Sequence, residues 1–252
     1  MPILSVEQIS VRFGGIVALD DVSFDIEPRQ IVGLIGPNGA GKTTLFNCVS
    51  RLYEPAGGRI RFEGKDLLGG RASQIAAFGI GRTFQNVALF TTMSVMQNVM
   101  VGAHSRTSSG FLASALKLPS SGHEETIQRE AAAEIIDFLE LGAVAHGPVA
   151  GLPFATMKRV ELARALASRP KLLMLDEPAG GLNHEEVAAL GGLIKRIRDE
   201  RGITVLLVEH HMGLVMAISD KVVVLDFGRK IAEGRPTDVQ RDPEVIKAYL
   251  GA

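Results

Sequence analysis

Residues 36–44 read Gly36-Pro37-Asn38-Gly39-Ala40-Gly41-Lys42-Thr43-Thr44. They follow the phosphate-binding loop pattern, in which a glycine and four free positions precede Gly-Lys-Thr. The apolar run 31–35 before them is typical of a buried strand, and we expect a helix over 43–52 after them, with Leu52 on its apolar face. A glycine-rich turn between a strand and a helix aims backbone N–H groups and the positive helix end at one point, which suits a phosphate.

Two side chains of the loop add chemistry of their own. Lys42 can reach the β- and γ-phosphates of a nucleotide, and the Thr43 hydroxyl can ligate Mg²⁺. The remaining loop residues would surround the phosphates mainly with backbone: Gly36, Pro37, Asn38, Gly39, Ala40, Gly41 and Thr44. The loop therefore predicts a site for a nucleoside triphosphate with Mg²⁺.

The composition is that of a folded protein with no general affinity for nucleic acid. Of the 252 residues, 46% are hydrophobic and 22% are charged, and the formal net charge is −1. Without a basic block we expect no nucleic-acid partner. A single cysteine, Cys48, allows neither a disulfide framework nor a cysteine zinc cluster. No run of about eighteen apolar residues predicts a membrane span.

Apolar runs predict an α/β fold with a mostly parallel sheet and an added antiparallel β layer. The early strands expected over 3–12, 22–26 and 59–62 should pair antiparallel. The runs 171–176 and 203–208 are of the buried parallel type, so the segment between them should be a crossover helix.

That crossover helix has a clear start. Asn183 is a typical N-cap, and Glu186 three residues later completes a capping-box pattern. Val187, Leu190, Ile194 and Ile197 then form an apolar stripe at helical spacing.

A change of character after residue 86 predicts an inserted helical subdomain over 87–150. Within it, Met93, Met96 and Met100 recur at helical spacing, either as core of the insertion or as a docking surface. We expect the nucleotide-binding core to comprise 1–86 and 151–235, and residues 236–252 to form a C-terminal helical tail.

A second chemical element lies at the end of the apolar run 172–175, where Asp176 and Glu177 follow directly. A buried strand delivers such groups to the carboxyl edge of a parallel sheet, where ligands bind in doubly wound folds. Asp176 would hold Mg²⁺, directly or through water, and Glu177 would contact the water that attacks the γ-phosphate. The alternative is two exposed acids at the start of a loop.

Five features follow one another along the chain in a characteristic order and spacing: the phosphate loop, Gln85, Asp176-Glu177-Pro178, the run Gly180-Gly181-Leu182-Asn183, and His210. The chain thereby resembles the ATPase subunit of an ABC transporter over nearly its whole length. Within this family, four short motifs resemble the ATPases of branched-chain amino acid importers: Arg12-Phe13-Gly14-Gly15, Arg82-Thr83-Phe84-Gln85, Glu209-His210-His211-Met212 and Ala248-Tyr249-Leu250-Gly251. Importers of urea or other amides share much of this pattern.

The resemblance implies roles for individual residues. Phe13 would stack on adenine, Gln85 would sense Mg²⁺ and the attacking water, and His210 would contact the γ-phosphate. Residues 180–183 would form a loop at a dimer contact. The alternatives are a core phenylalanine, an exposed polar loop residue and a structural histidine.

The family signature Leu-Ser-Gly-Gly-Gln, which caps ATP bound to the other subunit, is altered here to Leu152-Pro153-Phe154-Ala155-Thr156. Pro153 has neither a hydroxyl nor an N–H, and Phe154 restricts the close approach that glycine permits. The Ala155 N–H and the positive helix end survive, so we expect a weakened cap.

A weakened cap favours pairing with a different ATPase subunit over self-pairing. The resemblance further implies two transmembrane permease subunits, an indirect periplasmic or extracellular solute-binding partner, and a peripheral location on the cytoplasmic face of the cell membrane.

Other classes of function stay open at this point. A phosphate loop also occurs in switch GTPases and kinases, but the guanine-recognition run Asn-Lys-x-Asp is absent from the sequence. A lipid-export ATPase would share the same motifs. A soluble ABC-type ATPase of DNA repair or translation usually carries long coiled coils or two ATPase halves, which this chain lacks.

Overall fold

The structure is a computed structural model that describes residues 1–84, 87–103 and 119–250, with only the backbone for 119–125. The chain forms two compact units, the first from Met1–Arg82 and Lys171–Ala252, the second from Thr83–Pro170. The second unit is wider than the insertion expected over 87–150, and it includes the helix α6 (Phe154–Ala167).

An antiparallel sheet makes one layer of the first unit, as the sequence predicts. Its strands, in spatial order, are β2 (Ile16–Ile26), β1 (Leu4–Phe13), β4 (Gly57–Phe62) and β5 (Lys65–Asp66). Strand β2 begins well before the expected start at Val22, because β1 and β2 form one hairpin in which Phe13 pairs with Ile16.

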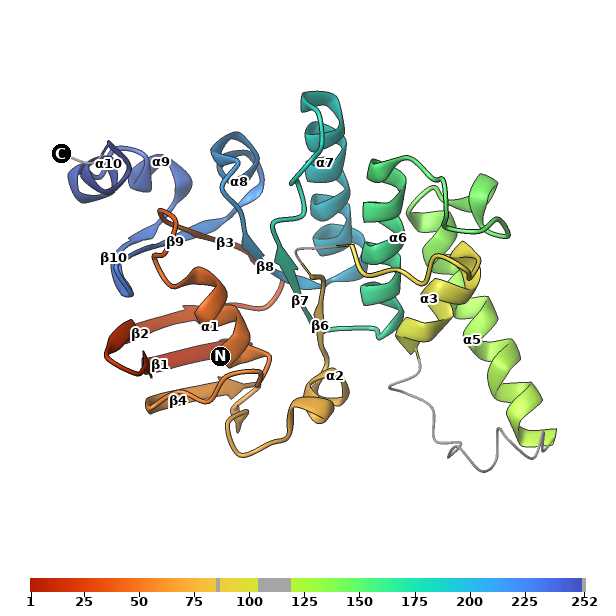
Figure 1. The fold of residues 1–252 in the computed structure, drawn as a ribbon, viewed down its shortest axis with the longest axis horizontal. Coiled ribbons are helices and arrows are strands. Elements are labelled where there is room, and N and C mark those ends of the chain that lie inside the picture. The colour runs from red at the N-terminus through yellow and green to blue at the C-terminus, as the bar shows by residue number, and fades with distance from the viewer. Residues whose placement is uncertain (85–86, 104–118, 251–252) are drawn as a thin grey trace. The chain divides into compact units, whose positions relative to one another are not determined.

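The second layer of this unit is a six-stranded, mostly parallel sheet (Figure 1). Its order is β10 (Arg229–Gly234), β9 (Lys221–Asp226), β3 (Ile31–Ile35), β8 (Thr204–Val208), β7 (Leu172–Asp176) and β6 (Ile80–Arg82). Only β10 pairs antiparallel. Every residue of β3, β7 and β8 is buried, which matches their continuous apolar sequences.

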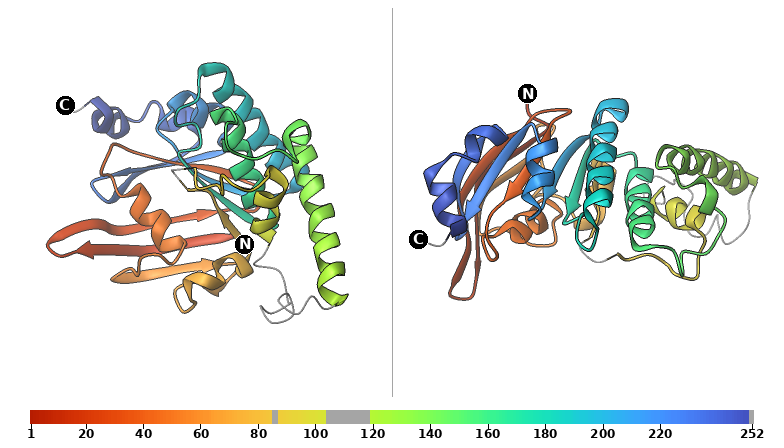
Figure 2. Two further views of the ribbon diagram at one scale, coloured as in Figure 1. Left: turned by 45° about the vertical axis from the view of Figure 1, so that its right-hand side comes forward. Right: turned by 90° about the horizontal axis from the view of Figure 1, so that it is seen from above.

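Helix α1 (Lys42–Val49) lies between the two sheets and shares their core (Figure 2). Val32 and Leu34 of β3 belong to that core. Gly33 faces the opposite side, where a Cβ would lie 2.5 Å from Val215 of α8 (Met212–Ile218). Helices therefore cover both faces of the parallel sheet.

The other helices of the first unit are η1 (Ala72–Gln74), α2 (Ile75–Phe78), α7 (His184–Arg201), α9 (Pro236–Val239) and α10 (Pro243–Leu250).

Helix α1 is shorter than the sequence predicts, and Leu52 is 55% exposed instead of lying on a buried face. Arg51 adopts a left-handed backbone conformation with φ 59°, which ends the helical path. The N–H groups of Leu52 and Tyr53 both donate to the carbonyl of Asn47, at 2.8 and 3.1 Å. This C-terminal turn reverses the chain and leaves Leu52 outside the core.

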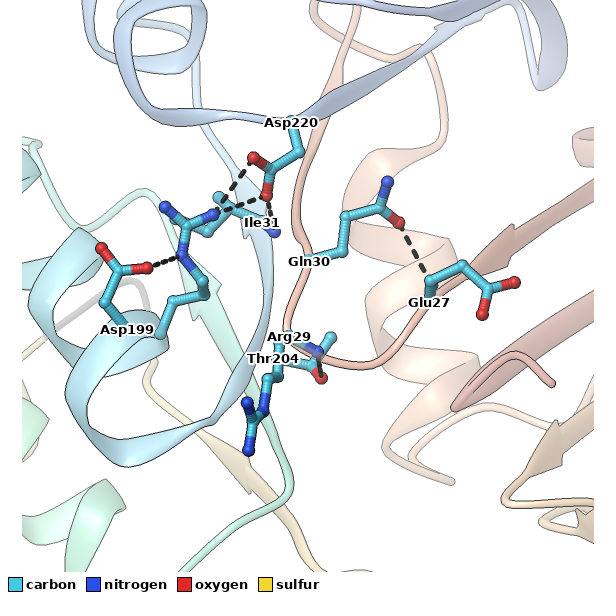
Figure 3. Close-up of polar contacts among 8 residues, drawn as sticks. Glu27, Arg29, Gln30, Ile31, Asp199, Thr204 and Asp220 are labelled. Carbon is cyan, nitrogen blue, oxygen red and sulfur yellow. Dashed lines mark hydrogen bonds and ion pairs between the residues drawn. The ribbon is translucent and has the colours of Figure 1, made fainter.

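The loop that joins the two layers is tied to the amino edge of the parallel sheet (Figure 3). The Arg29 N–H donates to Thr204 Oγ1 at 2.9 Å, and the Ile31 N–H donates to Asp220 Oδ2 at 2.8 Å. Arg198 also donates to Asp220, at 2.9 Å. These contacts brace the edge opposite to the one where β7 and β8 end.

The second unit is helical, with α3 (Val95–Ala103), α5 (Pro119–Phe138), η3 (Gly142–Val144) and α6. Helix α3 approaches α6 so closely that a Cβ on Gly102 would lie 1.9 Å from the carbonyl oxygen of Arg164. Met96 is only 9% exposed, which supports the core interpretation for that methionine.

Helix α5 starts earlier and has a slightly different buried face than the sequence predicts. Apolar spacing alone favours a helix over 124–141 with Ile127, Ala131, Ile135 and Phe138 on one face, but α5 starts at Pro119 and Ile127 is 48% exposed. The buried side chains of the segment are Ala132, Ile135, Ile136 and Leu139. Across both units, none of the helices in the described ranges is long and apolar enough to span a bilayer.

Candidate functional site

The glycine-rich loop joins β3 to α1, as its sequence predicts, and its shape depends on glycine. Gly36 has φ 150°, and a Cβ there would lie 2.0 Å from the carbonyl oxygen of Leu225. Gly41 has φ 100°, and a Cβ there would lie 2.6 Å from the carbonyl oxygen of Ala18. Neither position accepts a side chain without moving neighbouring backbone.

The start of α1 has no side-chain cap. Its N-cap is Gly41, which provides no capping oxygen, and its first turn holds no acidic residue. The first N–H groups of a helix have no partner within the helix. An anion bound at this end therefore meets unshared donors and the positive end of the helix dipole.

Lys42 lies folded against the loop that precedes it. Its Nζ donates to the carbonyl oxygens of Gly36 at 2.7 Å and Pro37 at 2.9 Å, and the residue is 8% exposed. Burial lowers the pKa of the Lys42 ammonium, and the Glu177 carboxylate opposes that shift. The loop lysine and the carboxylate after β7 are therefore close enough to interact electrostatically.

Asp176, Glu177 and His210 gather at the carboxyl edge of the parallel sheet. Asp176 ends β7 and pairs in register with Val208, the last residue of β8. The Glu177 N–H donates to the Val208 carbonyl at 2.9 Å, with Glu177 in the left-handed region at φ 47°. His210 Nδ1 lies 3.8 Å from Glu177 Oε2, so the two side chains are neighbours just beyond hydrogen-bond range.

Two further residues, Glu209 and Arg82, form hydrogen bonds at this edge of the sheet, and the sequence analysis assigned neither of them a role. Glu209 is buried, and its carboxylate accepts the Ala179 N–H at 2.8 Å and the N–H groups of His210 and His211 at 2.9 Å each. It thereby joins the loop after β7 to the turn after β8. Glu209 was visible in the sequence as the residue before His210, but its burial was not.

The second of these residues is Arg82, the last residue of β6. It donates to Asp176 Oδ2 at 2.9 Å and to Asn47 Oδ1 at 2.9 Å. Arg82 stood in a motif that supported the resemblance, yet its partners lie far away along the chain.

Phe13 lies at the end of β1 and is 47% exposed. Its ring centre is 5.2 Å from that of Tyr53, and the rings meet edge to face at 73°. The partner Tyr53 thus fixes the ring of Phe13 while part of it faces solvent, an arrangement compatible with base stacking. Gln85 lies outside the described residues, so its predicted role stays a prediction.

The run Gly180-Gly181-Leu182-Asn183 leads into α7, and its last residue caps that helix. Asn183 Oδ1 accepts the N–H groups of Glu185 and Glu186 at 3.0 Å each. Glu186 Oε2 in turn accepts the Asn183 N–H at 2.9 Å. The capping box is confirmed, as is the buried stripe that follows it along α7.

The altered signature, residues 152–156, opens α6 in the second unit. Pro153 is the N-cap and makes no side-chain capping bond. Phe154 is 42% exposed, and the Lys158 ammonium lies 5.6 Å from its ring centre. The start of α6 thus carries an aromatic ring where the family pattern has a glycine, with the Lys158 cation beside that ring.

Helix α6 also holds the segment on either side of residues 85 and 86. The Phe84 N–H donates to Glu161 Oε1 at 3.3 Å, and the Arg164 guanidinium donates to the Ala88 carbonyl. Burial raises the pKa of Glu161 above its ordinary value, although the neighbouring cations and N–H groups oppose that rise.

The available ligands suit Mg²⁺ in character. Thr43 offers a hydroxyl and Asp176 a carboxylate, both oxygen donors, and Mg²⁺ commonly uses one or two protein oxygens together with phosphates and water. Within the described ranges, no group of three or more His, Cys, Asp or Glu side chains could hold a metal ion by itself.

Comparison with known proteins places these features in a family. Residues 19–180 match the family model described as ABC transporter, and residues 229–252 match the model described as branched-chain amino acid ATP-binding cassette transporter. The chain is 44% identical to the high-affinity branched-chain amino acid transport ATP-binding protein BraF of Pseudomonas aeruginosa, over 99% of this chain and 98% of that protein. It is 42% identical to LivG, the protein of the same description from Escherichia coli, with the same coverage.

Solved structures agree. A nucleotide-free ATP-binding cassette from an ABC transporter is 32% identical, with a TM-score of 0.87 and full coverage of both chains. An ATP-binding cassette of an ABC transporter in its ADP conformation is 31% identical, with a TM-score of 0.86 and full coverage of both chains. The chain therefore belongs to the ABC transporter family, as one of its ATPase subunits.

Proposed function

We propose that this ATPase binds ATP with Mg²⁺ at residues 36–44 and uses the energy of hydrolysis to import branched-chain amino acids. The observation that supports the site most directly is the convergence of three elements on one sheet edge. The uncapped start of α1, the end of β7 and the turn after β8 bring Lys42, Glu177 and His210 to the same edge.

Each residue then has a distinct task. The backbone of 36–44 and Lys42 bind the phosphates, and Phe13 stacks on adenine. Thr43 and Asp176 would hold Mg²⁺, which would supply positive charge against the negative charge of the phosphates. Glu177 orients the attacking water and accepts its proton, His210 contacts the γ-phosphate, and Gln85 senses Mg²⁺ and the attacking water.

Glu177→Gln tests the catalytic assignment. The amide keeps the shape of the side chain but cannot accept a proton, so turnover should fall by about 10²–10⁴-fold while ATP binding persists. Steady-state hydrolysis and calorimetric titration measure the two quantities. Glu185→Gln, an exposed acid in the first turn of α7, is the matched control and should hydrolyse normally. Undiminished turnover in Glu177→Gln would refute the assignment.

Two similarities support the proposed substrate. The relatives at 44% and 42% identity are described as branched-chain amino acid transport proteins, and the C-terminal model that matches residues 229–252 names the same class of substrate. Stimulation of hydrolysis in the purified complex by its solute-binding protein loaded with leucine, but not with urea, would support this proposal. The reverse result would favour the amide importers.

The helical second unit is the proposed contact with the permease subunits at the cytoplasmic membrane face. Asn98, fully buried on α3, accepts the Phe90 N–H at 2.8 Å and donates to the Phe90 carbonyl at 3.0 Å. These bonds hold the backbone while the Phe90 ring stays 48% exposed. A photo-cross-linker at residue 90 should form adducts with the permease in the active complex, and a photo-cross-linker at residue 127, an equally exposed position on α5, should form none.

A further inference from the structure

Arg82 links two parts of the proposed metal site that belong to different elements. Its guanidinium donates to Asp176 Oδ2 at 2.9 Å, to Asn47 Oδ1 at 2.9 Å and to Ser50 Oγ at 2.9 Å. Asp176 ends β7, Asn47 lies on α1, and Ser50 is the C-cap of α1. One planar cation therefore bridges the strand and the helix.

The position of this cation is strongly constrained. The side chains of Arg82 and Asp176 are 11% and 5% exposed, so solvent screens their attraction little. The guanidinium carbon also lies 5.5 Å from the ring centre of Phe46, a fully buried residue of α1. Arginine can make these bonds together because its donors form a rigid fork, which lysine lacks.

The two bridged elements carry the two proposed protein ligands of Mg²⁺. Thr43 is in the first turn of α1, on the same helix as Asn47. Asp176 receives the Arg82 bond on Oδ2, which fixes the rotation of its carboxylate. The bridge therefore sets where the Asp176 carboxylate lies with respect to the Thr43 hydroxyl.

We propose that Arg82 is a positioning residue for the metal, which acts by holding Asp176 in register with α1. The inference rests on the proposed function, since it takes Thr43 and Asp176 as the metal ligands. Mutation of a group that orients a metal ligand typically lowers metal affinity or activity by about 10–100-fold. Arg82 bears on metal binding and has no part in holding the phosphates.

Two substitutions test the bridge from opposite ends. Arg82→Lys keeps the positive charge but cannot bond to Asp176 and α1 at once, and Asn47→Ala removes one of the two acceptors at α1 while leaving Ser50 and the charge in place. Mn²⁺ serves as the probe, and electron paramagnetic resonance measures its affinity for the full chain with bound ADP. Arg82→Lys should bind Mn²⁺ about tenfold more weakly, and Asn47→Ala should also bind it more weakly, by a smaller factor because the Ser50 bond remains.

The second measurement is ADP affinity in EDTA, which should not change because the phosphates are held by residues 36–44. Arg61→Lys is the matched control. Arg61 pairs with Glu7 on the antiparallel sheet at 3.1 Å, and its substitution should alter neither affinity. Thermal unfolding establishes that each variant is folded. If Arg82→Lys does not fold, Asn47→Ala alone tests the inference.

Unchanged Mn²⁺ affinity in folded Arg82→Lys and Asn47→Ala would overturn the inference. An equal loss of ADP affinity in EDTA would also overturn it, because Arg82 would then support the whole site. Failure of the proposed function is distinguishable from both outcomes. In that case the unaltered chain would bind no nucleotide, or would bind it independently of residues 36–44.

Discussion

The Lys42 ammonium bonds to carbonyl groups of its own loop in this structure, and a bound phosphate would be an alternative partner. The bonds to Gly36 and Pro37 satisfy the ammonium within a buried setting that disfavours its charge. A phosphate offers the ammonium a full opposite charge, whereas the loop carbonyls offer only dipoles, so the Coulombic attraction to a phosphate is larger. Binding of the triphosphate should therefore draw Lys42 away from the loop carbonyls.

Lys42→Ala should weaken ATP binding by at least about tenfold, since a bond to a charged partner contributes about 1.5–3 kcal/mol. Isothermal titration calorimetry measures the change. Lys65→Ala, which removes an exposed lysine from β5 in the same unit, should bind ATP as the unaltered chain does. Equal affinities for Lys42→Ala and Lys65→Ala would contradict the phosphate assignment.

The sequence predicts contacts between residues that are close along the chain but not contacts between distant ones. The capping pair Asn183 and Glu186 could be predicted because its partners are three positions apart and the spacing alone brings them together. The bridge from Arg82 to Asp176 spans 94 positions and could not be predicted from spacing. It depends on β6 lying beside β7, which only the sheet order establishes.

The sequence predicted the secondary-structure elements correctly where a run of residues is continuously buried, and less well at the ends of the elements. The apolar runs of β3, β7 and β8 became buried parallel strands as predicted. Helix α1 ended three residues early because Arg51 turned into the left-handed region, and apolar spacing does not report such backbone reversals. In α5, apolar spacing predicts Ile127 on the buried face, but the buried residues are Ala132, Ile135, Ile136 and, just after the helix, Leu139.

The packing of α3 on α6 makes a prediction about Gly102. A Cβ there would collide with the Arg164 carbonyl, so Gly102→Ala should destabilise the chain by about 1–3 kcal/mol. Gly192 on α7 is the matched control, because a Cβ there meets nothing within 4 Å. Gly192→Ala should be neutral or stabilising by up to about 1 kcal/mol. Urea unfolding measures both, and equal effects would contradict this account of the contact.

The hairpin of β9 and β10 carries a pH-dependent contribution through Glu233. Burial alone would raise the pKa of Glu233, but the ammonium groups of Lys221 and Lys230, at 2.7 and 2.6 Å, outweigh it and lower the pKa below its ordinary value of 4.5. A lowered pKa in the folded state means that the stabilisation is present above the ordinary value and is lost as pH falls through the folded value.

Glu233→Gln should therefore cost about 1 kcal/mol at pH 7, and the difference from the unaltered chain should disappear in acid well below pH 4.5. Denaturant unfolding across pH measures this. Glu200→Gln, which removes an exposed pair with Arg196 on α7, should change stability by less than about 0.5 kcal/mol at either pH. A Glu233→Gln deficit that persists unchanged in acid would contradict the ion-pair explanation.

For the assembled transporter, the departure of residues 152–156 from the family signature has consequences beyond this chain. Pro153 brings no capping group to the start of α6, and Phe154 and Lys158 occupy the space beside it. Residues 36–44, Asp176 and Glu177, in contrast, keep the family pattern. We propose that this helix start is a poor cap for ATP on the partner, and that the chain works in an asymmetric pair in which a different ATPase subunit supplies the intact signature.

Mixing the purified chain with that second subunit should raise the rate of ATP hydrolysis well above the sum of the separate rates. The same mixture with Glu177→Gln in this chain should lose most of the gain, because the productive site would combine Glu177 with the partner's signature. Steady-state phosphate release measures both rates. Strictly additive rates would refute the asymmetric pair and favour self-pairing.

The contact between Gly36 and Leu225 limits how the chain can be divided. The loop that begins at Gly36 lies against the backbone at Leu225, and the Gly228 N–H donates to the Ala40 carbonyl at 3.1 Å. A fragment that ended at residue 220 would contain the entire glycine-rich motif and yet lack the wall that shapes it. Split versions of the protein should accordingly recover nucleotide affinity only when the piece carrying residues 221–234 is supplied in trans.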